Sequence, residues 1–153
     1  VTPVGGISGT VFGGLLADYC QRNGGPHRTM SCLVLLCATT IPLGLFGIAP
    51  SWMMASVVLA LLVAVLTATC VMASTLFMIV IPNEIRGFTY GLFGGVGALL
   101  GGFSPLLVSG VSGMLGGEMM IGQSLTLVCV VSTMFATIVY AVARRHFVGA
   151  RVF

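Results

Sequence analysis

Two short segments carry the residue types of a serine nucleophile. Residues 6–9 (GISG) and 110–113 (GVSG) both match the G-x-S-G pattern of serine proteases that act inside membranes. Such a serine needs a base within hydrogen-bond reach. The only histidines are His27 and His146, and both lie beside arginines. Ser112 is expected near the opposite membrane face, about 30 Å away, so we predict no catalytic residues and no enzyme.

The spacing of the cysteines does not match that of a metal site. None of the five pairs with a histidine at the intervals that zinc ligands use. Thiols within apolar runs usually act as small packing residues, so we predict no metal and no cofactor. Four of them lie in apolar runs, namely Cys32, Cys37, Cys70 and Cys129. The fifth, Cys20, lies in a polar stretch.

The composition indicates a membrane protein. Of the 153 residues, 58% are hydrophobic and 6% are charged, and the mean hydropathy is +1.15. So few charges cannot keep a monomeric domain in solution, because soluble domains carry roughly a quarter charged residues. The net charge of +3 forms no basic patch interleaved with aromatics, so nucleic acid is excluded as a partner. An all-α, polytopic membrane helix bundle remains, expected as a single membrane domain over 1–153.

The gaps between charged residues predict the number of helices. No charged residue lies between Arg28 and Glu84, a stretch too long for one helix across a hydrocarbon core of about 30 Å. Pro50 ends one helix in this gap and Ser51 can cap the next. The apolar run before Asp18 is too short to cross the bilayer, so we interpret it as the end of a truncated helix. The predicted helices are about 1–18 (truncated), 29–49, 52–81, 88–114 and 121–143.

The arginines predict the orientation. Threading the chain back and forth places all six, together with both histidines, on one face. The positive-inside rule assigns this face to the cytoplasm. We therefore expect an integral, multi-pass membrane protein with a cytoplasmic C-terminus. No predicted span carries an ionisable group near its centre, so a proton-coupling group is expected outside this chain.

Glycines predict where helices pack. Gly87, Gly91 and Gly95 repeat at four-residue spacing and share one helix face. Rows of small residues let helix backbones approach closely within a membrane. Gly101 belongs to a second such row, and Pro105 removes a backbone hydrogen bond in the middle of the same helix. This helix is expected to pack on more than one side, and two interpretations stay open: the glycines only permit packing, or they also permit bending.

Two motifs together resemble the major facilitator superfamily. Residues 14–18 (GLLAD), followed by Arg22 and Arg28, resemble the loop motif between the second and third helices of each six-helix half. Residues 81–87 (IPNEIRG) resemble the P-x-E-x-R-G turn before the fifth helix of a half. The glycine-rich run through Pro105 is similar to that fifth helix, and residues 102–110 look most like the spinster-like branch. The degraded copies of the motifs favour a fragment of the C-terminal half.

The resemblance implies a function and assigns residues to it. The function is secondary active transport of a small solute or lipid-like substrate by alternating access. The implied partners are that substrate, the missing N-terminal half of the transporter and membrane lipids. The alternative from the residues is a non-transporting membrane scaffold or assembly subunit. The resemblance assigns Gly14, Asp18, Arg22 and Arg28 to a cytoplasmic gate, with Glu84 and Arg86 as its partners.

Overall fold

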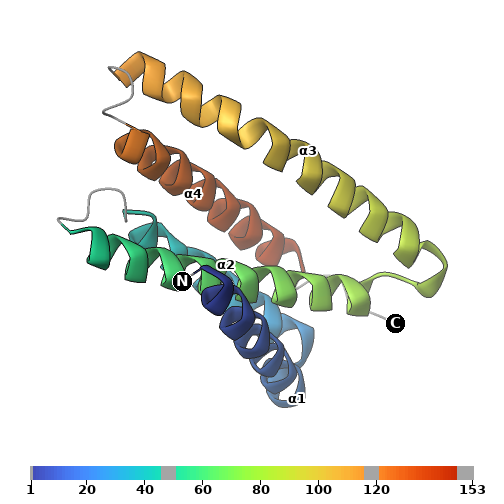
Figure 1. Cartoon of the computed structure of the whole chain (residues 1–153). Helices are drawn as coiled ribbons and strands as arrows, with labels where there is room; N and C mark the ends of the chain where they lie inside the picture. Colours follow the sequence, from blue (N-terminus) through green and yellow to red (C-terminus); the bar gives the residue numbers. More distant parts are fainter. Residues whose placement is uncertain (1, 46–50, 116–120, 148–153) are drawn as a thin grey trace.

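The protein is built only of α-helices in the part of the chain that the structure describes. This computed structural model describes residues 2–45, 51–115 and 121–147. The four helices are α1 (Thr2–Leu43), α2 (Trp52–Val80), α3 (Asn83–Leu115) and α4 (Ile121–Phe147). In Figure 1, α1 and α2 cross closely, α4 lies beside them, and α3 runs along the outer side of α4.

The helix α1 is a hairpin of two helical arms. Gly25 has φ 65° and ψ −163°, a conformation that is essentially open only to glycine. On either side of it, the sulfurs of Cys20 and Cys32 lie 3.0 Å apart, whereas twelve residues of straight helix would separate them by about 18 Å. The first arm is therefore 2–24 and the second arm 26–43. The polar loop expected between the first two predicted helices is reduced to this single reversal.

The first arm packs on α2 through three glycines. A Cβ atom added to Gly5 would lie 2.6 Å from the carbonyl oxygen of Ala60, and one added to Gly13 would lie 2.7 Å from the Cα of Ala68. Between them, Gly9 meets the side chain of Thr67 and the backbone of α2. Contacts this short leave no space for a side chain, so the glycines set the close approach of the two helices.

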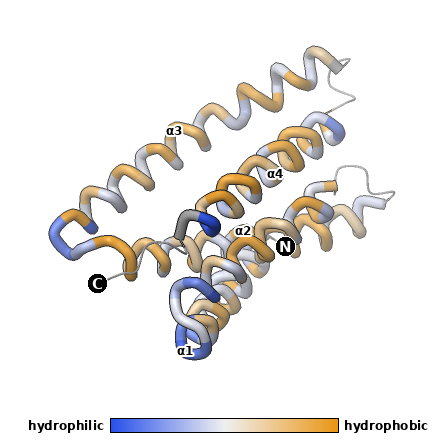
Figure 2. Tube along the Cα trace, turned by 180° about the vertical axis from the view of Figure 1, so that it is seen from behind, coloured by the Kyte–Doolittle hydropathy of each residue, from blue (hydrophilic) through white to orange (hydrophobic). Residues whose placement is uncertain are grey.

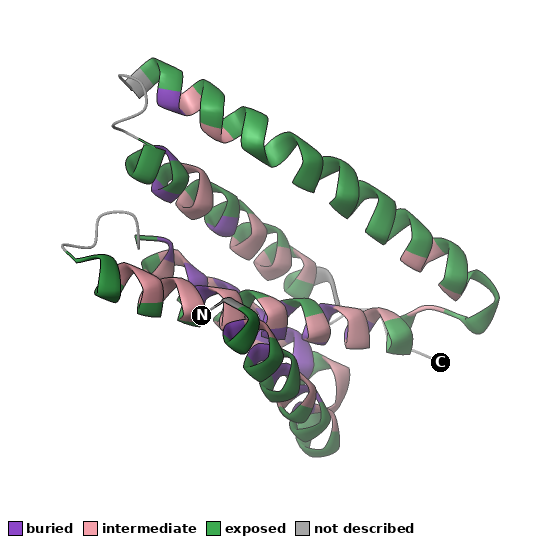
Figure 3. Cartoon of the chain, viewed as in Figure 1, coloured by how far each residue is buried: buried purple, intermediate pink, exposed green. Residues whose placement is uncertain are grey.

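The core lies where both arms of α1 meet α2. Leu33 of the second arm and Met72 of α2 are fully buried at its centre. The thiols of Cys20 and Cys37 belong to the same cluster, and Tyr140 brings α4 against it. Figure 3 shows the buried residues concentrated in this crossing. Most of the bundle's packing is therefore contributed by the first half of the chain.

The boundaries of α2 follow local signals. The Oγ of Ser51 accepts a hydrogen bond from the amide of Met54 at 3.2 Å, which confirms the predicted cap. At the other end the helix stops at Val80, before Pro82. The chain then turns directly into α3, which begins at Asn83 rather than near residue 88. Figure 2 marks this turn and the tip of α1 as hydrophilic segments between hydrophobic helices.

Helix α3 is largely uncovered. All residues from 91 to 107 are exposed, as Figure 3 shows along the length of the helix. Its first turns contact α2, where the Tyr90 hydroxyl donates to the carbonyl of Ser74 at 2.9 Å and the rings of Phe77 and Phe93 meet edge to face at 5.3 Å. Its last turns lie against α4. Close packing on more than one side is absent within the described part of the chain.

Three described helices are long and apolar enough to cross a membrane. They are Trp52–Val80, Asn83–Met114 and Ile121–Arg145. The length and apolar composition of these three helices are those of a membrane protein. A further span was expected over 29–49, but α1 is not among the three. Its second arm begins beside the polar His27 and Arg28 and ends at Leu43, and residues 46–50 lie outside the described part.

Candidate functional site

The charged residues of the predicted gate lie on the two arms of α1 near its reversal at Gly25, and Gly14 lies in the middle of the first arm. Gly14, Asp18 and Arg22 belong to the first arm and Arg28 to the second. The three charged side chains are exposed. Asp18 and Arg22 are one turn apart, yet they form no ion pair in the described structure. The structure thus brings the motif to one end of the bundle without joining its charges.

Arg28 holds the two arms of α1 together near this reversal. Its guanidinium donates to the carbonyl of Asn23 at 3.3 Å and its Cζ lies 5.7 Å from the ring centre of Tyr19, a favourable cation–π arrangement. Its side-chain stem also covers Gly24, where an added Cβ would meet the Arg28 Cδ at 2.6 Å. Arg28 therefore has a structural role that the sequence did not reveal.

Arg86 binds the end of α2 instead of the gate motif. One of its terminal nitrogens donates to the carbonyl of Met78 at 2.6 Å and to that of Ile81 at 3.3 Å. The Met78 carbonyl belongs to the last turn of α2 and Ile81 directly follows the helix, where helical partners are missing. Glu84 is exposed beside it. No ion pair joins Asp18 to Arg86 among the described residues, so the partnership of Arg86 with the gate stays a prediction.

The glycine row of α3 faces no other described helix. A Cβ added to Gly87, Gly91, Gly95 or Gly101 would meet nothing within 4 Å. The packing role of this row therefore stays a prediction that concerns a partner outside the described bundle. The same spacing at Gly5, Gly9 and Gly13 does mediate packing, and sequence reasoning missed it although the four-residue interval was visible.

A cavity with hydroxyl groups lies between α3 and α4. Its volume is about 640 Å³, and it combines Ser104, Ser109 and Ser112 with apolar walls such as Ile121 and Leu125. Pro105 also lines it. Because proline has no N–H, the carbonyl of Gly101 lacks its helical donor at this level, although α3 continues as one helix. The cavity thus borders a point of α3 where one backbone hydrogen bond is missing.

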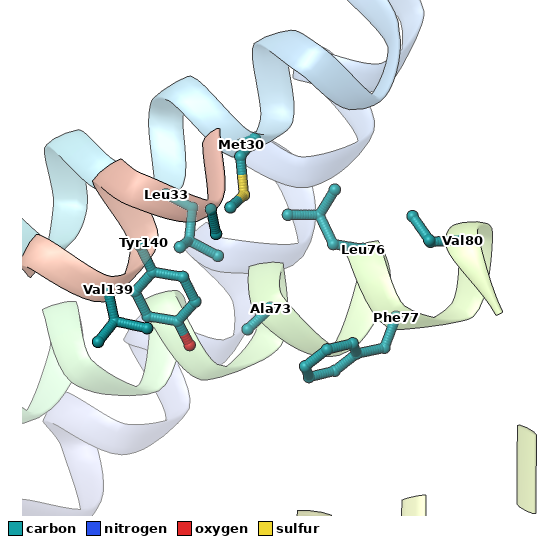
Figure 4. Close-up of a pocket in the computed structure, with 9 residues that line it drawn as sticks. Met30, Leu33, Ala73, Leu76, Phe77, Val80, Val139 and Tyr140 are labelled. Carbon is teal, nitrogen blue, oxygen red and sulfur yellow. The ribbon is translucent and has the colours of Figure 1, made fainter. Parts of the chain in front are cut away.

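A second cavity is almost wholly apolar. It measures about 250 Å³ and lies between the second arm of α1, the C-terminal half of α2 and α4. Figure 4 shows Met30 and Leu33 facing Ala73 and Leu76 across it, with the Tyr140 ring at its side. A space of this size and lining can take a short hydrocarbon group but cannot orient a polar one.

Ser112 and His27, two of the residues considered for serine chemistry, lie in different cavities at opposite ends of α4. Ser112 shares its cavity with Ser109 and Ile121, near the end of α3 and the start of α4. His27 shares a different cavity with Arg144 and Arg145 at the other end of α4. His146 lies outside the described side chains. Within the described residues, no three histidine, cysteine or acidic side chains cluster as metal ligands would.

Known proteins offer no direct guide to these sites. Comparisons of the chain with protein-family models, with characterised proteins and with solved structures found no match.

Proposed function

We propose that this chain is part of a secondary active transporter that moves a small solute or lipid-like substrate across a membrane by alternating access. The observation that carries the proposal is the open glycine face of α3, which lies next to the serine-lined cavity. A helix of 33 residues is about 50 Å long. It can cross the bilayer at a tilt and present both features within the membrane.

The glycine face supports a second helical body in the complete protein. Lipid chains adapt to any side chain, so a row of glycines brings no advantage against lipid. Against another helix it permits close backbone contact, as the row on the first arm of α1 does against α2. We assign the covering helices to the N-terminal half that the family resemblance implies.

The cavity between α3 and α4 supports a substrate path. Three hydroxyl groups beside apolar walls suit a ligand that is largely apolar with a few polar groups. The cavity belongs to one half only, and transporter sites lie between two repeats. The missing half would therefore complete the site, and bending at Gly101 and Pro105 would change its access.

The charges at the tip of α1 fit the proposed gate. Asp18, Arg22 and Arg28 are exposed at the end of the bundle where the α2–α3 turn also lies (Figure 1). Arg86, at that turn, would have to exchange its backbone acceptors on α2 to reach Asp18. The positive-inside rule favours a cytoplasmic location for this end, and a cytoplasmic C-terminus is part of the proposal.

A membrane scaffold or assembly subunit is the second candidate. It is favoured by one observation: the cavity between α3 and α4 has no ionisable side chain among its lining residues. Proton or ion paths usually include such groups. A scaffold would use the same glycine face to bind a separate subunit permanently.

The test is uptake by the native-length protein in proteoliposomes. Radiolabelled amino acids, sugars, organic acids and lysophospholipids would be offered to vesicles with and without protein. The proposal expects saturable uptake of one class, and loss of that uptake when Gly95 is replaced by leucine. If the protein is a scaffold, no substrate class should be taken up, and one subunit should co-purify with the protein at fixed stoichiometry.

A further inference from the structure

A third cavity carries positive charge at the end of α4. Its volume is about 460 Å³, and it opens between the second arm of α1 and the last turns of α4. Its lining consists of His27 and Val34 from α1 and of Ala141, Arg144 and Arg145 from α4. Two helices that are distant in sequence therefore build one site.

The charges of this cavity lack a described counter-charge. No carboxylate lines it. Over residues 2–45, 51–115 and 121–147, the side chains of His27, Arg144 and Arg145 have no ion pair and no hydrogen bond. A cleft lined by one sign of charge focuses its field and attracts an oppositely charged ligand. Guanidinium groups match phosphate oxygens in two-pronged hydrogen bonds, so a phosphate group is the anion that this lining fits best.

The surroundings favour a phosphate that carries hydrocarbon chains. Val34 and Ala141 form an apolar wall beside the cations. Towards the middle of α4, Ile138 and Val142 are about half exposed, and they can contact an acyl chain. The candidate span Ile121–Arg145 has both arginines at its end, the level at which lipid headgroups begin. A free anion could use the arginines but not these apolar surfaces.

We propose that this cavity binds the phosphate of an anionic phospholipid from the leaflet at the arginine end of the bundle. Basic pockets between membrane helices are general sites for anionic headgroups. The C-terminal end of α4 carries a partial negative charge, which favours the two arginines beside it. The proposal does not depend on transport and applies equally to a scaffold.

The experiment is native mass spectrometry of the full native-length protein in detergent. Phosphatidylglycerol, phosphatidylcholine and inorganic phosphate are each titrated against the wild type and against an R144Q/R145Q double variant. Arg22→Gln is the matched control, because it removes an exposed arginine at the same end of the bundle that does not line the cavity. Circular dichroism confirms that each variant is folded, and His27→Gln serves as a milder second variant.

The expected result is retention of phosphatidylglycerol by the wild type and by Arg22→Gln. Each arginine removed from the cavity should weaken binding about fivefold, and His27→Gln should weaken it less. Equal binding of phosphatidylglycerol to the double variant and to the wild type would overturn the proposal, as would equal retention of phosphatidylcholine. Displacement of the lipid by an equal concentration of inorganic phosphate would also overturn it, because the site would then recognise the free anion.

Discussion

The sulfur of Cys20 lies 3.0 Å from the sulfur of Cys32, although twelve residues separate the two along the chain. This contact is possible only because α1 reverses at Gly25, where φ is 65°, and the reversal makes α1 a helical hairpin with the predicted gate charges on both of its arms. The hairpin in turn positions the second arm, which contributes to the core, to the apolar cavity and to the basic cavity at the end of α4.

Oxidation should join Cys20 to Cys32. In a full-length variant whose other cysteines are replaced by alanine, copper phenanthroline should give an intramolecular disulfide. Mass spectrometry of the digested protein identifies the linked peptides. A variant that keeps Cys20 and Cys70 is the control, because Cys70 is exposed on a different helix. Equal yields from the two variants would contradict the hairpin.

The thiol of Cys20 should react slowly at neutral pH. Burial, reinforced by the hydrogen bond with Cys32, raises the pKa of Cys20 from 9.0 to about 11. Because only the thiolate reacts, and the shift is upward, alkylation by iodoacetamide should rise about tenfold per pH unit and continue to rise above pH 9. A rate that levels off near pH 9, measured by peptide mass spectrometry, would show an unperturbed thiol. The variant Cys32→Ala should lower the pKa and speed the reaction at pH 8.

A side chain at Gly9 should separate α1 from α2. Gly9→Ala places a methyl group against Thr67 and the α2 backbone, and overpacking of this kind costs about 1–3 kcal/mol. Thermal unfolding of the full-length protein in detergent measures the loss. Gly6→Ala is the matched control, since nothing lies within 4 Å of its added Cβ. If both variants unfold at the same temperature, α1 and α2 do not approach each other closely at Gly9.

Arg86 should matter for stability in a way that Asp18 does not. Arg86→Gln removes a charged donor from the last carbonyls of α2, and such hydrogen bonds contribute about 1.5–3 kcal/mol. The exposed Asp18 contributes no described contact, so Asp18→Asn should leave the unfolding midpoint unchanged. Glu84→Gln, also exposed, controls for the change of charge at the turn. Equal losses from Asp18→Asn and Arg86→Gln would instead support an ion pair between Asp18 and Arg86.

A leucine at Gly91 should distinguish assembly from folding. Nothing lies within 4 Å of a Cβ at this position, so Gly91→Leu should leave α1, α2 and their core unchanged. In the proposed transporter the same leucine meets the other half and should abolish uptake. Uptake equal to the wild type in proteoliposomes, from a folded variant, would mean that no helix covers this face.

Local signals in the sequence were sufficient to predict the ends of α2. Ser51 caps it and Pro82 follows it, and both act within a few residues of their own position. The contrast between the two glycine rows shows what local signals lack. Gly9 and Gly91 have the same four-residue spacing, yet only Gly9 contacts another described helix. Spacing indicates that a face can be approached closely, whereas the identity of the partner depends on tertiary arrangement.

The roles of two arginines were also beyond sequence reasoning. Arg28 and Arg86 were both assigned by resemblance to a gate, and both donate to nearby backbone carbonyls. Whether an arginine binds a carboxylate or the end of a helix depends on which acceptor the fold brings within reach. The basic cavity at the end of α4 was missed for the same reason, because its residues come from two distant segments.

The proposed transporter consists of this bundle and a second helical half that covers α3. The most direct measurement is the mass of the native polypeptide, detected with an antibody against the C-terminal residues 144–153. The account predicts a single band well above the 15.8 kDa of the present chain, with enough additional length for a second helical half. A band at 15.8 kDa would contradict the half-transporter and would leave the scaffold as the function to pursue.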